Sequence, residues 1–336
     1  MPRKLRKQYP GAKYHITARG VGGKNIFARD ADRERFLGQL EYALDTDDVV
    51  LYAYALMQNH YHLLVETPLG NIGAFEHRLN TAYSTYYRLR RKWKGHVLQH
   101  RYGGKLVHGD GYLVAVTRYI HLNPVKIAAM RRGSEPERLD YLNRYPWSSY
   151  RGYVQKRHEE DMVNYRWREL MGVASESRRR AAYRQYVERF ISKDDDKTLT
   201  ALELSPYAIG DKAFIDEIEK EMNEQRSTVR ARADIVWPKM TRPDIDDVER
   251  AVAKEFGVGI KALSLHGRRV GPAKRVAVEF ACRLCGLTQR AAGERYGSIT
   301  CAAVGKLRRK LAGELREDAD LRRRVARLEE SLDPRE

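Results

Sequence analysis

The fold is decided by residues 53–64, which read AYALMQNHYHLL. Two β-rich runs, 49–57 and 60–67, meet in this stretch across a two-residue break. Runs joined so tightly predict an antiparallel hairpin. Because side chains alternate along a strand, His60 and His62 share one face of the hairpin.

Strand-like and helix-like segments alternate around this hairpin within the first 150 residues. The order βαββα, with later pieces, predicts an α+β fold in which helices pack on a ferredoxin-like antiparallel sheet. The further segments expected are a strand over 14–18, helices over 30–44, 72–93 and 112–122, and a strand within 97–107.

Beyond this region the hydrophobic pattern is helical. We expect three parts: a first module over 1–153, a mostly helical connector over 154–242 without recognisable chemistry, and an all-α module over 243–336. The helices expected after residue 153 span 178–190, 214–225, 248–256, 273–285, 288–296, 299–311 and 321–332.

Composition limits the class of protein. The chain has 336 residues, of which 42% are hydrophobic and 32% charged, so it can bury cores and is not a disordered chain. The net charge is +18, and residues 1–150 alone hold 24 basic and 13 acidic residues, a net +11. A basic first module favours a polyanionic partner, most simply nucleic acid.

The sequence also indicates a compartment. No run approaches the roughly 20 apolar residues of a membrane span, and the basic start lacks the apolar core of a signal peptide. We therefore expect a cytoplasmic protein. The chain has three cysteines, too few for a disulfide framework. Cys282 and Cys285 lie in an apolar helical segment and are interpreted as buried thiols, not as a zinc site.

Two pairs of residues suggest chemistry. His60 and His62 can hold one divalent metal ion if a third ligand comes from elsewhere, although an isolated pair of this kind is more often structural. Tyr119 and Asn123 lie four residues apart, on one face of a predicted helix. Asn123 offers a carboxamide oxygen to a hard cation, and Tyr119 offers a phenol that can attack phosphorus. Taken alone, Tyr119 would be interpreted as a buried aromatic.

Taken together, these stretches resemble the HUH single-tyrosine transposases, specifically the REP-associated tyrosine transposases of bacteria. The resemblance covers residues 8–153, somewhat under half of the chain. The matching stretches are YHITARG at 14–20, IF at 26–27 with DR at 32–33, AYALMQNHYHLL at 53–64, RYIHLNPV at 118–125 and PWSSY at 146–150.

The resemblance implies a chemistry. It implies that His60 and His62 bind Mg²⁺ or Mn²⁺ and that Tyr119 cleaves single-stranded DNA through a 5′-phosphotyrosine intermediate. The implied substrates are imperfect palindromes folded as hairpins, and the protein is expected to be a monomer or a homodimer. Asn123 is expected as the third metal ligand, from its place one helical turn after Tyr119 and by analogy with relatives. The chain departs from the family at residues 103–104, a glycine pair where relatives tend to carry a lysine and a small residue.

Basic residues in the first module predict DNA contacts, especially where they interleave with aromatics near the end of the 72–93 helix. The same pattern would suit a solvated helix end. The expected DNA-binding residues here are Arg3, Lys4, Arg6, Lys7, Arg88, Arg90, Arg91, Lys92, Arg101 and Arg118.

In the last module, two short helices broken at Gly297 predict a helix-turn-helix, with a basic second helix. The residues RR at 268–269, AKR at 273–275 and TQRAAGERYG at 288–297 resemble, more weakly, the DNA-binding domain of the bacterial replication initiator DnaA. The initiator's usual Asp-His-Thr stretch is absent, so its sequence preference is not carried over. A small helical bundle for protein contacts is the alternative. The expected contacts to duplex DNA are Arg268, Arg269, Ser298, Thr300, Lys306, Arg308 and Arg309.

Two functions therefore stand side by side. The first is a metal-dependent DNA nuclease and strand transferase of the transposase kind. The second is a non-catalytic hairpin-DNA-binding protein or regulator derived from such an enzyme. The presence of both histidines, the tyrosine and the asparagine favours the enzyme, because binding alone does not need them.

Overall fold

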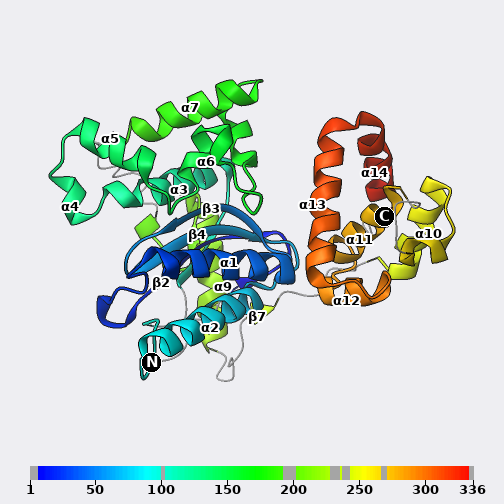
Figure 1. The fold of residues 1–336 in the computed structure, drawn as a ribbon, viewed down its shortest axis with the longest axis horizontal. Helices are drawn as coiled ribbons and strands as arrows, with labels where there is room; N and C mark the ends of the chain where they lie inside the picture. Colours follow the sequence, from blue (N-terminus) through cyan, green and yellow to red (C-terminus); the bar gives the residue numbers. More distant parts are fainter. Residues whose placement is uncertain are drawn as a thin grey trace. The chain divides into compact units, whose positions relative to one another are not determined.

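The computed structural model describes residues 7–99, 103–191, 202–227, 235–236, 243–265 and 271–332 (Figure 1). It contains two compact units, one of residues through Glu41 with Val49–Val236, the other of Tyr42–Asp48 with the residues after Val236. The boundary expected after residue 153 does not coincide with this division, because the described residues of the predicted connector up to Val236 pack with the first unit. None of the described helices is long and apolar enough to cross a bilayer.

A five-stranded sheet in the order β3-β4-β2-β5-β6 forms the centre of the first unit. The first four strands in this order are antiparallel neighbours, and β6 adds a parallel edge beside β5. With helix α1 (Asp30–Asp47) before β3 and helix α2 (Ile72–Arg91) before β5, the strand order is that of a ferredoxin-like sheet, so the predicted α+β class is confirmed. The strands are β2 (Ala12–Arg19), β3 (Val50–Leu56), β4 (His60–Thr67), β5 (Gly103–Val107) and β6 (Ala208–Ile209).

One face of this sheet is covered by α1 and α2, as Figure 1 shows. Phe36 of α1 is fully buried, and its ring lies 4.8 Å from the ring of Tyr61 on β4 and 5.2 Å from that of Tyr83 on α2. Burying one such side chain contributes about 2 to 3 kcal/mol. Because side chains alternate along a strand, the odd-numbered residues of β4 point into this apolar face, away from the two histidines.

The opposite face carries helix α3 (Asp110–Leu122), which contacts β3 and β4. His121 of α3 is fully buried, and its two ring nitrogens form hydrogen bonds with the Tyr183 hydroxyl at 2.7 Å and the Ser149 hydroxyl at 2.9 Å. Tyr183 belongs to α7 (Glu176–Glu188), and Ser149 precedes α6 (Tyr150–Val154). Neighbouring elements thereby fix the position of α3 on the sheet.

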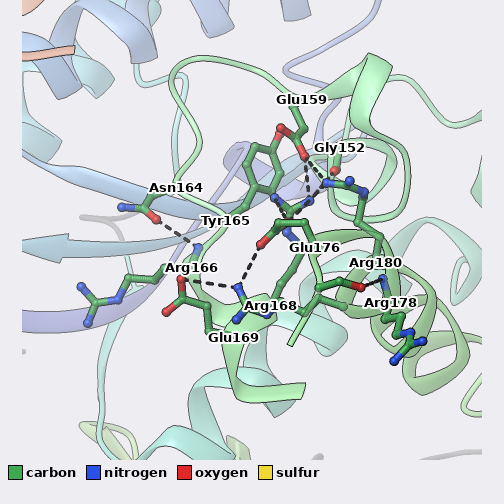
Figure 2. A network of polar contacts seen from close by, with 12 residues as sticks. Gly152, Glu159, Asn164, Tyr165, Arg166, Arg168, Glu169, Glu176, Arg178 and Arg180 are labelled. Carbon is green, nitrogen blue, oxygen red and sulfur yellow. Dashed lines mark hydrogen bonds and ion pairs between the residues drawn. The ribbon is translucent and has the colours of Figure 1, made fainter. Parts of the chain in front are cut away.

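A polar network holds α7 in place (Figure 2). The Arg168 guanidinium, which is buried, contacts Glu159 at 2.8 Å and Glu176 at 3.2 Å. Arg180 contacts the same two carboxylates at 3.1 and 3.3 Å. The network thus holds α7 against η4 (Arg166–Met171). The same helix is held against α3 by the hydrogen bond between Tyr183 and His121.

Several elements of the first unit were not expected from the sequence, most of them because they are too short to show a period. They are β1 (Lys7–Gln8), η1 (Val21–Gly23), η2 (Asn123–Val125), α4 (Ala128–Arg131), α5 (Glu135–Arg144), η3 (Lys156–His158) and β7 (Ile235–Val236). The predicted helix at 214–225 is observed as α9 (Lys212–Ser227).

The second unit is helical, as predicted. Its buried core includes Val252, Val276, Phe280, Tyr296 and Val304. The described elements after residue 243 are α10 (Ile245–Phe256), η5 (Ile260–Ser264), α11 (Ala273–Arg283), α12 (Gln289–Arg295), α13 (Cys301–Glu317) and α14 (Ala319–Ser331).

A tight turn joins α12 to α13. Gly297 and Ser298 both have positive φ, at 98° and 53°, a region that glycine tolerates and serine rarely adopts. The side chain of Thr300 accepts a hydrogen bond from the backbone NH of Ala303 and so caps α13. A β-carbon at Gly293 would lie 2.2 Å from the carbonyl oxygen of Ile299, so the turn packs directly on α12.

Candidate active site

The two histidines lie on β4 with their side chains on the face that carries α3. His62 pairs with Thr17 of β2, and His60 pairs with Arg19. Their ring centroids are 4.9 Å apart, with planes at 84°. The predicted shared face is therefore observed, and Arg19 stands directly across the sheet from His60 as an exposed cation.

Tyr119 projects from α3 toward this pair. Its ring centroid lies 5.7 Å from that of His62, with the two planes at 90°. The side chain is half-buried. A phenol and an imidazole that are far apart in the sequence thus meet on one face of the sheet, because α3 crosses that face and is held there by His121.

Asn123 lies one turn after Tyr119, at the end of α3. Its amide nitrogen donates a hydrogen bond of 2.8 Å to the backbone carbonyl of Tyr119. Because the nitrogen faces that carbonyl, the carboxamide oxygen points away from it. This oxygen is the atom that would bind a metal ion.

A third histidine, His15, belongs to the site and was not predicted from the sequence. Its Nε2 lies 3.1 Å from Nδ1 of His62, and the two rings stack with centroids 5.3 Å apart. Its centroid lies 5.8 Å from that of Tyr119. His15 shares a strand face with Thr17, but only the pairing of β2 with β4 shows that this face carries the histidine pair.

Burial keeps all three imidazoles neutral at physiological pH. It lowers the pKa of His60 to about 4, with a further effect of Arg19. It lowers the pKa of His15 to about 3, and it lowers the pKa of His62 well below 6.5, with the two other histidines adding to the effect. Neutral imidazole is the form that binds metal ions.

The Tyr119 phenol is shifted in the opposite sense. Burial raises its pKa above 10.0, the negative charge of Glu203 raises it further, and a hydrogen bond from Asn123 partly opposes them. The phenol is therefore protonated at neutral pH and must lose its proton to act as a nucleophile.

The donor set fits a divalent cation in one specific respect. Nε2 of His62 is buried without a hydrogen-bond partner, as expected for an atom kept for a metal ion. Across the described residues, no group of three or more His, Cys, Asp and Glu side chains gathers as a metal site. A third protein ligand would thus have to be of another type, and the carboxamide of Asn123 is such a group.

The predicted DNA contacts of the first unit differ in their exposure and in their partners. Arg88, Arg90 and Lys92 are exposed at the end of α2, where Lys92 has a left-handed backbone, and Arg91 pairs with Asp32 at 2.8 Å. Arg3, Lys4, Arg6 and Arg101 lie outside the described residues.

Lys7 and Arg118, which were also predicted to contact DNA, are both buried. Lys7 is 7% exposed and forms an ion pair of 2.8 Å with Glu221. Arg118 is 5% exposed, and its guanidinium lies 3.7 Å from the ring centroid of Phe190 and 4.6 Å from that of Tyr186. Neither cation is presented to a phosphate, because each is buried against its own unit.

In the second unit, Ser298, Thr300, Lys306 and Arg309 are exposed along the α12–α13 turn and α13. Arg308 differs from the prediction, since its Nε donates a hydrogen bond of 2.7 Å to Glu279 of α11. Its charge is therefore partly neutralised within the unit. Arg268 and Arg269 lie outside the described residues.

Comparison with known protein families finds a match for the first part of the chain. Residues 8–123 match the family described as "Transposase IS200 like". The matched segment contains His15, His60, His62, Tyr119 and Asn123.

One solved structure also resembles part of the chain. A solved structure of a "REP associates tyrosine transposase bound to a REP hairpin" aligns with 49% of this chain and 92% of its own, at 12% identity and a TM-score of 0.39. No curated protein matches the chain.

Proposed function

We propose that the protein is a metal-dependent single-stranded DNA endonuclease and strand transferase. It cleaves palindromic hairpin DNA by attack of Tyr119 on a backbone phosphate. The observation that supports this proposal most is the position of the Tyr119 ring, 5.7 Å from His62 on the face that bears both histidines. This geometry occurs within a transposase-family domain that is strongly basic.

In the proposed reaction the Tyr119 oxygen forms a bond to phosphorus, and the bond from phosphorus to the 3′ oxygen breaks. The product is a 5′-phosphotyrosine and a free 3′-hydroxyl. The proton that leaves the phenol is balanced by the proton gained at the 3′ oxygen. Attack by a 3′-hydroxyl of another strand reverses the step and joins DNA, because the ester to tyrosine conserves the bond.

The side chains that would hold the metal ion are His60 and His62, through Nε2, and Asn123, through its carboxamide oxygen. Such an ion, Mg²⁺ or Mn²⁺, supplies positive charge to the scissile phosphate. Arg19, exposed and across from His60, lies where it can bind the same phosphate or its neighbour. The exposed cations at the end of α2 extend this basic surface.

The second unit is proposed to bind duplex DNA, with α13 as the helix that enters the major groove. Its N-terminal turn exposes Ser298 and Thr300, and Lys306 follows one to two turns later. In a helix-turn-helix, residues near the start of the second helix contact base edges.

The test uses a labelled hairpin oligonucleotide, the full-length protein and Mg²⁺ or Mn²⁺. The wild-type protein is expected to form a covalent adduct that survives denaturation. Tyr119→Phe is expected to form none, whereas Tyr112→Phe, on the same helix, keeps it. His60→Ala and His62→Ala are expected to lose cleavage while retaining most hairpin binding.

Two results would count against the proposal. Adduct formation by Tyr119→Phe would show that another residue is the nucleophile. Tight hairpin binding by the wild-type protein without cleavage in any divalent metal would favour a non-catalytic binding protein.

A further inference from the structure

We propose that Asn59 and His15 are positioning residues that fix the tautomers of His60 and His62, so that both present a bare Nε2 to the metal ion. This inference rests on the proposed function, since it concerns the same site. It adds two residues, neither of which would touch the metal or the DNA.

Asn59 fixes the tautomer of His60. Its amide nitrogen donates to the carbonyl oxygen of Gly23 at 3.1 Å, which fixes the orientation of the carboxamide. Its oxygen therefore faces Nδ1 of His60, at 2.7 Å. Because a carboxamide oxygen only accepts hydrogen bonds, Nδ1 of His60 must carry the hydrogen. A neutral imidazole has one ring hydrogen, so Nε2 of His60 is left with its lone pair.

His15 fixes the tautomer of His62. Nδ1 of His62 and Nε2 of His15 are 3.1 Å apart, so one of them donates to the other. Nε2 of His62 is buried and has no hydrogen-bond partner. Either tautomer leaves Nε2 unpaired, but a buried N–H without an acceptor is rarer in proteins than a buried acceptor without a donor, so a lone pair is better tolerated at this atom than a hydrogen. The hydrogen is therefore favoured on Nδ1, where it is donated to His15, and Nε2 again keeps its lone pair.

The stacked geometry supports the same role. The His15 and His62 rings are nearly parallel, at 13°, and His15 is 7% exposed. A buried, stacked neighbour restricts rotation of the His62 ring as well as its tautomer. No proton is gained or lost in this device, because each ring keeps one hydrogen and only its position is set. Partners of this kind typically change metal affinity by about 10- to 100-fold.

The tautomers can be measured before any metal is added. In full-length protein labelled with ¹⁵N-histidine, two-bond ¹H–¹⁵N correlation spectra distinguish the Nδ1–H from the Nε2–H form. His60→Gln and His62→Gln assign the signals. We expect both rings as Nδ1–H in the wild-type protein. A His62 signal of the Nε2–H type would overturn the role given to His15, and the same result for His60 would overturn that given to Asn59.

Matched variants then separate the hydrogen bond from packing. Asn59→Ala and His15→Phe remove the acceptor, whereas His15→Gln keeps one. Asn143→Ala, which removes an asparagine that bonds only within α5, is the control. The first two are expected to mix the tautomers of the affected ring and to weaken Mn²⁺ binding, measured by electron paramagnetic resonance, by about 10- to 100-fold. His15→Gln and the control are expected to bind within about threefold of wild type.

The outcomes distinguish this inference from the proposed function. If the wild-type protein binds Mn²⁺ and forms the adduct, while Asn59→Ala and His15→Phe bind Mn²⁺ as tightly as wild type, the inference is wrong and the function stands. If the wild-type rings are Nδ1–H but no Mn²⁺ binds and no adduct forms, the proposed function fails, and with it the purpose given to the two residues.

Discussion

Tyr119 has to lose a proton before it can attack, and Glu203 makes this harder. Because burial and Glu203 raise the Tyr119 pKa, the rate of adduct formation is expected to rise with pH between 7 and 9. Glu203→Gln removes a negative charge and is expected to shift the pH–rate profile to lower pH. The shift should be less than about one unit, since Glu203 is exposed to solvent. Asp216→Asn on α9 is the control, and an unchanged Glu203→Gln profile would contradict this account.

Glu160 provides a second residue-level prediction, on stability. Burial raises its pKa from 4.5 to about 7, while a hydrogen bond from Tyr54 and the charge of Arg151 oppose the shift. The unfolded chain loses this proton near pH 4.5 and the folded chain near pH 7, so stability falls as pH rises between these values and is level above them.

Glu160→Gln removes this pH dependence and can still accept from the Tyr54 hydroxyl. We expect it to raise the free energy of unfolding at pH 8 by up to about 3 kcal/mol and to leave it nearly unchanged at pH 4. Chemical denaturation at both pH values measures this. A larger loss of stability at pH 8 than at pH 4 would be incompatible with a protonated buried carboxyl.

Single residues also show what the sequence could and could not reveal about the site. His60, His62 and Tyr119 were predictable because strand alternation and their motifs place them on defined faces, and the structure brings their rings together. His15 was missed because its role depends on which strand pairs with β4, which is a long-range property. The surroundings of Arg118 could not be predicted, because one residue along a helix turns a side chain by about 100°, here from the side of Tyr119 to a contact with Phe190.

At the scale of elements, the stability of the second unit depends on the close contact between α12 and the turn before α13. Gly293→Ala would bring a β-carbon to 2.2 Å from the Ile299 carbonyl, which forces the turn to move. We expect a loss of about 2 to 4 kcal/mol in the stability of the second unit. Gly313→Ala in α13 is the matched control, since its β-carbon meets nothing within 4 Å and should stabilise the helix by up to about 1 kcal/mol.

Thermal unfolding followed by circular dichroism compares the two variants. Equal stability of Gly293→Ala and Gly313→Ala would show that α12 and the turn do not pack as described. Duplex binding should fall with Gly293→Ala, because the turn that positions α13 is displaced.

The elements themselves were largely predictable where they are long and periodic. The hairpin of β3 and β4, helices α1 to α3 and most helices of the second unit agree with the expected ranges within a few residues, whereas α13 continues six residues beyond the expected end at 311. β6 was not predictable, because its two residues carry no period and it forms only by pairing with the edge of β5. This pairing also explains why the predicted connector contributes to the first unit instead of separating two modules.

At the scale of the whole molecule, a net charge of +18 makes the contribution of charge to DNA binding measurable. Binding of hairpin and of duplex DNA is expected to weaken linearly in log Kd against log salt. Lys306→Ala is expected to weaken duplex binding several-fold and to lower the salt slope by about one, without changing the yield of hairpin adduct. Lys261→Ala, an exposed lysine of the same unit in η5, is the charge-matched control.

These binding assays also separate the functions of the two units. If Lys306→Ala and Lys261→Ala weaken duplex binding equally, α13 is not the helix that docks. If Lys306→Ala abolishes the hairpin adduct, the second unit takes part in cleavage rather than in a separate contact.

The central claim is that Tyr119 becomes covalently linked to DNA. The most direct measurement is peptide mapping of the adduct formed with a hairpin oligonucleotide, after digestion with trypsin and nuclease. Cleavage after Arg118 and Lys126 isolates residues 119–126, a peptide with one tyrosine. We predict that this peptide carries a nucleotide linked through its 5′ phosphate to Tyr119. A nucleotide on any other peptide, or a cleaved hairpin with no modified peptide, would contradict the account.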